Sequence, residues 1–399
     1  MNDIKFEVMK KISDVSFRCR DIGNHLNSNS PPSVFVGSGL KYPLVNVGIL
    51  SPLEKDENVW IYDNERYWAQ NNFEILDILD LRNSLLNSRF QSKVSDARLN
   101  KKFVDIAKEI AIASNPVDIE IELKSKLMMG REKDKVITGI GMRAPLKTAR
   151  ITSNIKVDQK VDKVINDEIK ASDGIEYLYK NNFSEYTLSK ILSIGVLGLK
   201  KSKKFVPTRW SITATDDTIG KSLLNNIRDF KWIEDDELFF GEFLGNQYLI
   251  MLFPGVWSFE LFELYLPYSS WNQSNKIKAS TDYEGYHERK EYAFNTAGGY
   301  YATRLPILEY LNKIKRQASV VVIRLETRSY WAALGVWVVR ESVRKALANQ
   351  RMKFDSKEEI LEGASKIGKI KFSFECSEIL RKSRVLNEIK TQKNLKEWF

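Results

Sequence analysis

The sequence predicts an α+β protein, with an irregular α/β arrangement as the alternative. Residues 117–123 alternate strictly between apolar and acidic side chains, which is the pattern of a half-buried strand. Residues 320–326 open with four consecutive apolar side chains, which favours a central, fully buried strand. Helical patterns lie among the strands without the regular alternation of a doubly wound sheet. We therefore expect a mixed-sheet N-terminal body, a helix-rich basic C-terminal region and a flexible C-terminal peptide.

Each expected element follows from local periodicity and from Gly and Pro punctuation. Helices are predicted over residues 3–20, 72–90, 96–114, 158–170, 185–193, 299–316, 336–349, 356–366 and 377–390, and from Asp216 or Asp217 onward. Strands are predicted as short pieces within residues 33–48 and at residues 117–123, 136–140, 238–244, 247–253, 257–265 and 320–326. The three strands between residues 238 and 265 are expected to form a meander, followed by polar loops over residues 268–282. Pro306 is expected to kink its helix.

Composition indicates a globular protein long enough for two or three domains. The 399 residues are 43% hydrophobic and 29% charged, and the two cysteines are too few for a disulfide framework. The first residues lack the apolar core of a signal peptide, and no run approaches the ~20 apolar residues that span a bilayer. We expect an intracellular, cytoplasmic protein associated with the nucleoid, without a membrane partner.

The positive charge is concentrated near the C-terminus. The net charge is +10, and residues 301–399 hold 21 Lys and Arg against 11 Asp and Glu. Residues 1–300 hold 41 of each sign. A basic segment on a neutral body suggests a polyanionic partner such as nucleic acid. A solvated basic helical surface is the alternative.

The final eight residues separate apolar from polar positions sharply. Leu395, Trp398 and Phe399 are apolar, and the positions between them are charged or amide. A spacing of three places Leu395 and Trp398 on one side of a 3₁₀ turn, and Gln392 precedes them by one turn. Two adjacent aromatic side chains are costly to leave in water, so we expect a partner to bury them. Packing of the tail on its own protein is the alternative.

A basic run at residues 200–204 leads into Arg209 and Trp210. This pair fits a phosphate contact beside a stacking surface, or equally an internal ion pair beside a core aromatic. Asp216 and Asp217 are candidate catalytic carboxylates, with helix capping as the alternative.

The Gly-Lys-Ser run that ends at residue 222 resembles the end of a P-loop, but Thr215 stands where that motif needs a glycine. A nucleotide-binding loop is therefore not expected, and Lys221 is kept as a candidate nucleic-acid contact. Glu260 and Glu263 share a predicted strand, but metal-assisted chemistry needs carboxylates that converge. No metal site is expected.

Gly298 and Gly299 stand at the start of a predicted helix. They would allow an anion to approach the helix N–H groups, or they form a tight turn against a neighbouring segment. Tyr300 fits stacking on a base, with burial as the alternative. Arg304 and Arg316 follow on the same helix and favour contact with nucleic acid.

Four blocks carry a resemblance to a known family. They are SPPSVFVG at residues 30–37 with Tyr42-Pro43, VPTRWSITA at residues 206–214, GGYYATRL at residues 298–305 and LGVWVVRE at residues 334–341. In this order they resemble the archaeal Nre family of DNA repair proteins. The blocks are spread along the chain from residue 30 onward, so the resemblance covers nearly the whole chain.

The resemblance implies a division of the chain and one partner. After a helical segment it implies an N-terminal Nre region, a basic C-terminal Nre region and a clamp-interacting peptide, at residues 1–29, 30–285, 286–391 and 392–399. It assigns binding of the sliding clamp PCNA to Gln392, Leu395, Trp398 and Phe399. Many members begin with a four-cysteine zinc finger, but only Cys19 precedes residue 30 here. We therefore expect no zinc finger, and the identity of any cofactor stays open.

Three functions stay open, because the family implies no established reaction. The first is a DNA damage repair protein that PCNA tethers near DNA. The second is an enzyme acting on DNA or a DNA adduct, delivered by the same tail, with Arg209, Asp216 and Asp217 as the first residues to test. The third is a non-catalytic DNA-binding or scaffold protein that uses its basic final quarter.

Overall fold

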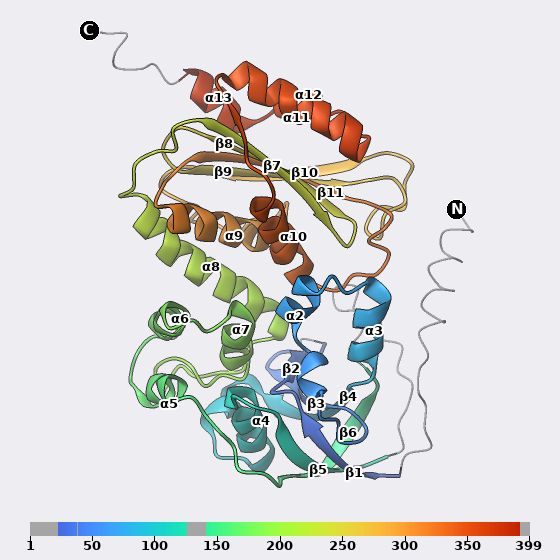
Figure 1. The fold of residues 1–399 in the computed structure, drawn as a ribbon. Coiled ribbons are helices and arrows are strands. Elements are labelled where there is room, and N and C mark those ends of the chain that lie inside the picture. The colour runs from blue at the N-terminus through green and yellow to red at the C-terminus, as the bar shows by residue number, and fades with distance from the viewer. Residues whose placement is uncertain (1–22, 38, 126–140, 392–399) are drawn as a thin grey trace. The chain divides into compact units, whose positions relative to one another are not determined.

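The chain folds into two compact α+β units, each built on a six-stranded sheet (Figure 1). This computed structural model describes residues 23–37, 39–125 and 141–391. Unit 1 is Met1–Ile219 and unit 2 is Gly220–Phe399. The α+β class predicted from the sequence is confirmed.

Unit 1 contains a sheet with the strand order β1-β5-β6-β4-β3-β2. Its strands are β1 His25–Ser30, β2 Val34–Gly37, β3 Leu44–Ser51, β4 Leu86–Lys93, β5 Val117–Leu123 and β6 Arg143–Ile151. Its helices are η1 Val59–Ile61, α2 Glu65–Gln70, α3 Ile75–Asn83, η2 Val94–Arg98, α4 Lys102–Ile112, α5 Gln159–Asn166, α6 Ala171–Lys180 and α7 Glu185–Ser193. Helix α4 packs on β2, β3 and β6. Strand β5 buries its apolar residues and leaves its acidic residues less buried, as its alternation predicts.

Unit 2 contains a sheet with the strand order β10-β9-β11-β8-β7-β12. Its strands are β7 Asp236–Phe243, β8 Asn246–Phe253, β9 Ser258–Tyr265, β10 Lys278–Glu284, β11 Ser319–Glu326 and β12 Met352–Phe354. Its helices are α9 Gly299–Ile314, α10 Trp337–Ala348, α11 Lys357–Phe372, α12 Ser377–Leu380 and α13 Arg384–Thr391, and α8 Thr208–Ile227 extends into it. Helices α9 and α10 cover one face of this sheet, and α11 and α13 cover the other (Figure 1).

Strand β11 is the central strand of unit 2, as its apolar start predicts. All eight of its residues are buried. It pairs in parallel with β9 and in antiparallel with β8, so it separates these two strands. The predicted three-strand meander is therefore wrong, because a strand some 60 residues later in the chain inserts between its second and third members.

Other elements also differ from the sequence predictions, because the tertiary structure overrides the local sequence pattern there. Helix α8 begins at Thr208, directly after Pro207, instead of at Asp216 or Asp217. The helix expected to residue 90 ends at Asn83, and strand β4 follows. Strand β10 replaces the end of the expected polar loops, and two short helices replace the single helix predicted near the C-terminus. The segments predicted at residues 3–20 and 136–140 lie outside the described residues.

A buried carboxylate holds α13 on the sheet. Glu260 of β9 is 3% exposed and accepts hydrogen bonds from the amides of Arg384 and Val385, at 3.1 Å each. It also accepts a hydrogen bond from the hydroxyl group of Ser383 at 2.6 Å. A carboxylate at a helix N-terminus satisfies amides that have no partner within the helix. Because Leu386 is buried as well, α13 is fixed at its start by both polar and apolar contacts.

We predict that Glu260→Ala releases α13. The substitution leaves one buried amide, one partly buried amide and one hydroxyl without their acceptor, so the free energy of unfolding should fall by about 2 kcal/mol. Urea unfolding measures this loss, and amide hydrogen exchange should show α13 opening first. Glu291→Ala, which removes an exposed carboxylate in the same unit, is the control and should change neither reading.

Candidate functional site

A cluster of buried polar side chains lies on the sheet face that α9 and α10 cover. The register places Arg324 of β11 beside Glu263 of β9 and Tyr248 of β8. Glu326, two residues later on the same face, lies beside Asn246 of β8. We call Asn246, Glu263, Arg324 and Glu326 the Arg324 cluster. Strands β9 and β11 are parallel, and their carboxyl ends are where α/β sheets commonly bind ligands.

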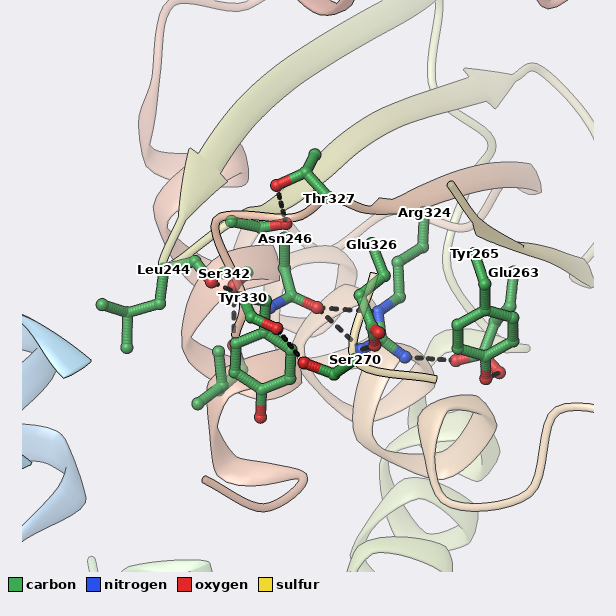
Figure 2. Close-up of polar contacts among 12 residues, drawn as sticks. Leu244, Asn246, Glu263, Tyr265, Ser270, Arg324, Glu326, Thr327, Tyr330 and Ser342 are labelled. Atoms are coloured by element: carbon green, nitrogen blue, oxygen red, sulfur yellow. Dashed lines mark hydrogen bonds and ion pairs between the residues drawn. The ribbon is translucent and has the colours of Figure 1, made fainter. Parts of the chain in front are cut away.

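Arg324 is the centre of this cluster (Figure 2). Its Nη1 contacts Glu263 Oε1 at 2.5 Å, and its Nη2 lies 3.5 Å from Glu326 Oε2. Its Nε and Nη2 also donate to Asn246 Oδ1, at 3.0 and 2.7 Å. The hydroxyl of Tyr265 donates to the second oxygen of Glu263 at 3.1 Å. The guanidinium is therefore held from three strands.

The charges of the cluster do not balance when both carboxyl groups are ionised. One guanidinium faces two carboxyl groups, each only 1% exposed. Burial raises the pKa of Glu326 to about 7, although Arg324 lowers it in part. The carboxyl group of Glu263, close by, raises it further. The pKa of Glu326 therefore lies near neutral pH, and the proton that it binds offsets the excess negative charge of the cluster.

The two glycines before α9 accommodate this cluster. A Cβ on Gly299 would lie 1.8 Å from Glu263 Oε1 and 3.2 Å from Arg324 Nη1. Gly298 has φ +93°, a conformation that other residues rarely adopt. The start of α9 therefore packs closely against the internal carboxylate of Glu263. This agrees with the tight turn against a neighbouring segment that was the alternative to anion binding for these glycines.

The arginine predicted on α9 belongs to a second buried pair. Arg304 is 2% exposed, and its Nε contacts Glu284 Oε1 at 2.6 Å. The indole N–H of Trp257 donates to the same oxygen at 2.9 Å. A Cβ on Gly220 would lie 2.6 Å from Arg304 Nη1, so the glycine of the P-loop-like run faces this guanidinium. Tyr300 is fully buried beside the pair.

The remaining predicted residues of the body differ in exposure. Arg209 is exposed, and Trp210 exposes 60% of its surface, so Trp210 is not a core aromatic. Asp216 is buried in the middle of α8, and Asp217 is partly buried on the next position. These two aspartates therefore do not cap α8.

Lys221 and Arg316 lie in unit 2. Lys221 is exposed on α8. Arg316 follows the end of α9 and lies 3.6 Å from Glu234, an exposed carboxylate. Contacts of both residues with nucleic acid stay predictions.

Glu260 and Glu263 do not converge. They are three residues apart on one strand, so they point to opposite faces of the sheet. Glu260 holds α13, and Glu263 holds Arg324. No group of three or more metal-ligating side chains occurs among the described residues.

Sequence reasoning missed the Arg324 cluster, although a signal was present. Arg324 and Glu326 are the charged residues of a strand that otherwise reads as fully buried. Charges two residues apart on such a strand share one face and need partners there. The partners on β8 and β9 could not be identified, because the strand order was predicted differently.

Two family models match nearly the whole chain. The model for the N-terminal region of archaeal Nre proteins matches residues 3–272, and that for the C-terminal region matches residues 284–398. The chain belongs to the archaeal Nre family. The boundary between the two Nre regions therefore differs from the boundary between the two compact units, which falls after Ile219.

Named relatives support the same membership. The chain is 38% identical to the DNA repair protein NreA of Haloferax volcanii, over 82% of this chain and 79% of the relative. It is 38% identical to the DNA repair protein NreA of Archaeoglobus fulgidus, over 86% of each chain. It is 34% identical to the DNA repair protein NreB of that organism, over 85% of this chain and 84% of the relative. No solved structure matches this Nre protein.

Two further sequence predictions for this Nre chain concern its C-terminal peptide and its relation to membranes. The clamp-interacting peptide, with Gln392, Leu395, Trp398 and Phe399, lies outside the described residues. Within residues 23–37, 39–125 and 141–391, no helix combines the length and apolar character needed to cross a membrane.

We predict that stability falls with rising pH because of Glu326. Its pKa is about 7 in the folded chain and ordinarily 4.5, so the folded state binds the proton more tightly. The stabilisation of the folded state that comes from this tighter proton binding is complete below pH 4.5 and is lost as pH rises through 7. It amounts to about 3 kcal/mol, at about 1.4 kcal/mol per tenfold change in proton affinity.

Urea unfolding between pH 5 and pH 8 measures this effect. Glu326→Gln mimics the protonated carboxyl group, so the variant should lose about 2.5 kcal/mol less than wild type over this range. Glu291→Gln serves as the control and should follow wild type. Parallel pH profiles for wild type and Glu326→Gln would contradict the assignment.

We predict that Gly299→Ala destabilises unit 2 strongly. The new methyl group would overlap Glu263 Oε1 and push it from Arg324, which should cost about 3 kcal/mol. Gly39→Ala is the matched control, since a Cβ there meets nothing within 4 Å. Thermal unfolding compares the two, and equal melting temperatures would rule out the close packing described here.

Proposed function

We propose that this chain is a DNA repair protein that the sliding clamp PCNA recruits through residues 392–399. Two observations support the repair role: membership of the Nre family, and relatives named DNA repair proteins at 34–38% identity. The recruitment rests on the pattern of Gln392, Leu395, Trp398 and Phe399. This pattern is the observation that carries the proposal.

The peptide would bind by burying its aromatic side chains. Trp398 and Phe399 are the anchors, and Leu395 joins them on one side of a 3₁₀ turn. In small interfaces a few aromatic anchors supply most of the binding free energy. Gln392 would fix the register, because its side chain both donates and accepts hydrogen bonds.

The body gives the peptide a firm attachment. Helix α13 ends at Thr391, one residue before the peptide. Its first turn is bonded to Glu260, and two of its own residues, Val385 and Leu386, are buried. A short link between two binding elements raises the effective concentration of the second. Docking of the peptide would therefore hold unit 2 close to the DNA that the clamp encircles.

The net positive charge of unit 2 lies next to this attachment. Residues 220–365 hold nineteen cationic and nineteen acidic side chains, whereas residues 366–391 hold seven and three. Three of the seven cations form ion pairs, with Glu362, Glu375 and Glu388. The other four are exposed: Lys371, Arg381, Lys382 and Lys390. They form the part of the basic final quarter best suited to contact DNA phosphates.

We predict that Trp398→Ala/Phe399→Ala abolishes most of the clamp binding. Removal of both anchors should cost at least ~2 kcal/mol, or roughly thirtyfold in affinity. Isothermal calorimetry with purified clamp measures the loss. Asn394→Ala/Lys396→Ala, which changes only positions between the anchors, should bind within about threefold of wild type. Unchanged binding of the anchor variant would disprove clamp recruitment through this peptide.

A further inference from the structure

Two basic segments of unit 1, far apart in the sequence, are packed together. The amide of Phe205 donates to the carbonyl of Val94 at 2.9 Å. The Nη1 of Arg98 donates to the carbonyl of Lys201 at 2.8 Å. Gly195, with φ +76°, fits between them, because a Cβ there would lie 2.5 Å from the Lys204 carbonyl and 2.9 Å from the Ala97 side chain. The η2 segment and the loop before α8 therefore form one surface.

This surface is strongly positively charged. Its cations are Lys93, Arg98, Lys101 and Lys102 from the first segment, and Lys200, Lys201, Lys203, Lys204 and Arg209 from the second. All but Lys203 are exposed. Between residues 93 and 102 and between residues 200 and 209, the one acidic residue is Asp96. Its carboxylate is buried and accepts a hydrogen bond from Lys101 at 2.8 Å.

Crowding of like charge is visible at Lys203. Its Nζ donates to the carbonyl of Ile165 at 2.8 Å. Burial lowers the pKa of Lys203, and the nearby charges of Lys108 and Lys200 lower it further, while Glu168 raises it in part. Net charge conceals this feature, because residues 1–300 are neutral as a whole. Surfaces usually mix both signs, and a concentrated patch of one sign favours binding of a counter-charged partner.

An exposed aromatic side chain follows directly. Arg209 and Trp210 lie in the first turn of α8, four and five residues after Phe205. Trp210 exposes 60% of its surface, which is costly unless something covers it. Grooves that bind single strands combine cations for the backbone with aromatic rings on which bases stack. A duplex has its bases stacked internally and offers nothing to such a ring.

We propose that this composite surface binds single-stranded DNA. Arg98, Lys200, Lys201 and Lys204 contact phosphates, and Arg209 positions the strand while a base stacks on Trp210. The site lies wholly in unit 1 and needs neither the clamp peptide nor the basic residues after 365. It adds a second DNA contact to the one expected near the tail.

The charge contribution is tested with Lys200→Gln/Lys201→Gln/Lys204→Gln in the full chain. Fluorescence anisotropy with a labelled 20-nucleotide oligothymidylate gives affinity across a salt series. Loss of three phosphate contacts should reduce the slope of log affinity against log salt by about 2, at ~0.7 per contact for single strands. Lys55→Gln/Lys124→Gln/Lys156→Gln removes the same charge from exposed positions elsewhere in unit 1 and should retain the wild-type slope.

The stacking contribution is tested with Trp210→Ala. Affinity for the oligothymidylate should fall roughly tenfold or more, and Trp210→Phe should recover part of it. Trp232→Ala, which removes a tryptophan of similar exposure from unit 2, is the control and should bind normally. Affinity for a 20-base-pair duplex should not change in either variant.

Several outcomes would overturn the proposal. An unchanged salt slope in the lysine variant, or an equal change in its control, would exclude a specific surface. Equal loss of duplex and single-strand binding in Trp210→Ala would exclude stacking. These results are independent of clamp recruitment, because calorimetry of the lysine variant with the clamp should match wild type. Conversely, the Trp398→Ala/Phe399→Ala variant should bind the oligothymidylate normally.

Discussion

A single buried guanidinium constrains the architecture of the second unit. Arg324 lies on the central strand, and its charge is tolerable only because Glu263, Asn246 and Glu326 surround it. Glu263 and Asn246 come from the two flanking strands, so the cluster requires β11 to lie between β8 and β9. The Glu263 carboxylate leaves no room for a side chain at position 299, and it therefore sets how closely α9 can approach the sheet. Strand order, helix packing and a family sequence block thus depend on one interaction.

The local sequence pattern correctly predicted those elements whose buried residues can be identified from their own sequence. The alternation of β5, the apolar start of β11 and the periodicity of α7 and α9 each predicted the correct element. It failed where distant segments decide the outcome. The meander was wrong because pairing between β9 and β11 cannot be read from either strand, and α8 starts at Thr208 because Pro207 offers an earlier start than the two aspartates.

The candidate sites show the same division. The clamp peptide stays a prediction, and it could be proposed from sequence because its information is local, a spacing of apolar residues within eight positions. The Arg324 cluster and the basic surface of unit 1 could not, because each is assembled from segments at least 60 residues apart. Net charge drew attention to the final quarter and concealed the basic surface of unit 1. Residues 1–300 are neutral in total, yet the fold brings together two cationic segments, which are in contact through Arg98 and Lys201.

The clamp peptide and the basic surfaces respond differently to their surroundings, and this difference explains why one chain would carry both. Burial of Trp398 and Phe399 depends on apolar area and is nearly insensitive to salt. Contacts from Lys371, Arg381 or Lys201 to phosphates weaken steeply as salt rises. Under the proposed recruitment, a peptide anchored through α13 would raise the local concentration of DNA, so individually weak contacts would suffice once the clamp is bound. Weak contacts also release readily, which lets a tethered protein search DNA near the clamp without being held at one place.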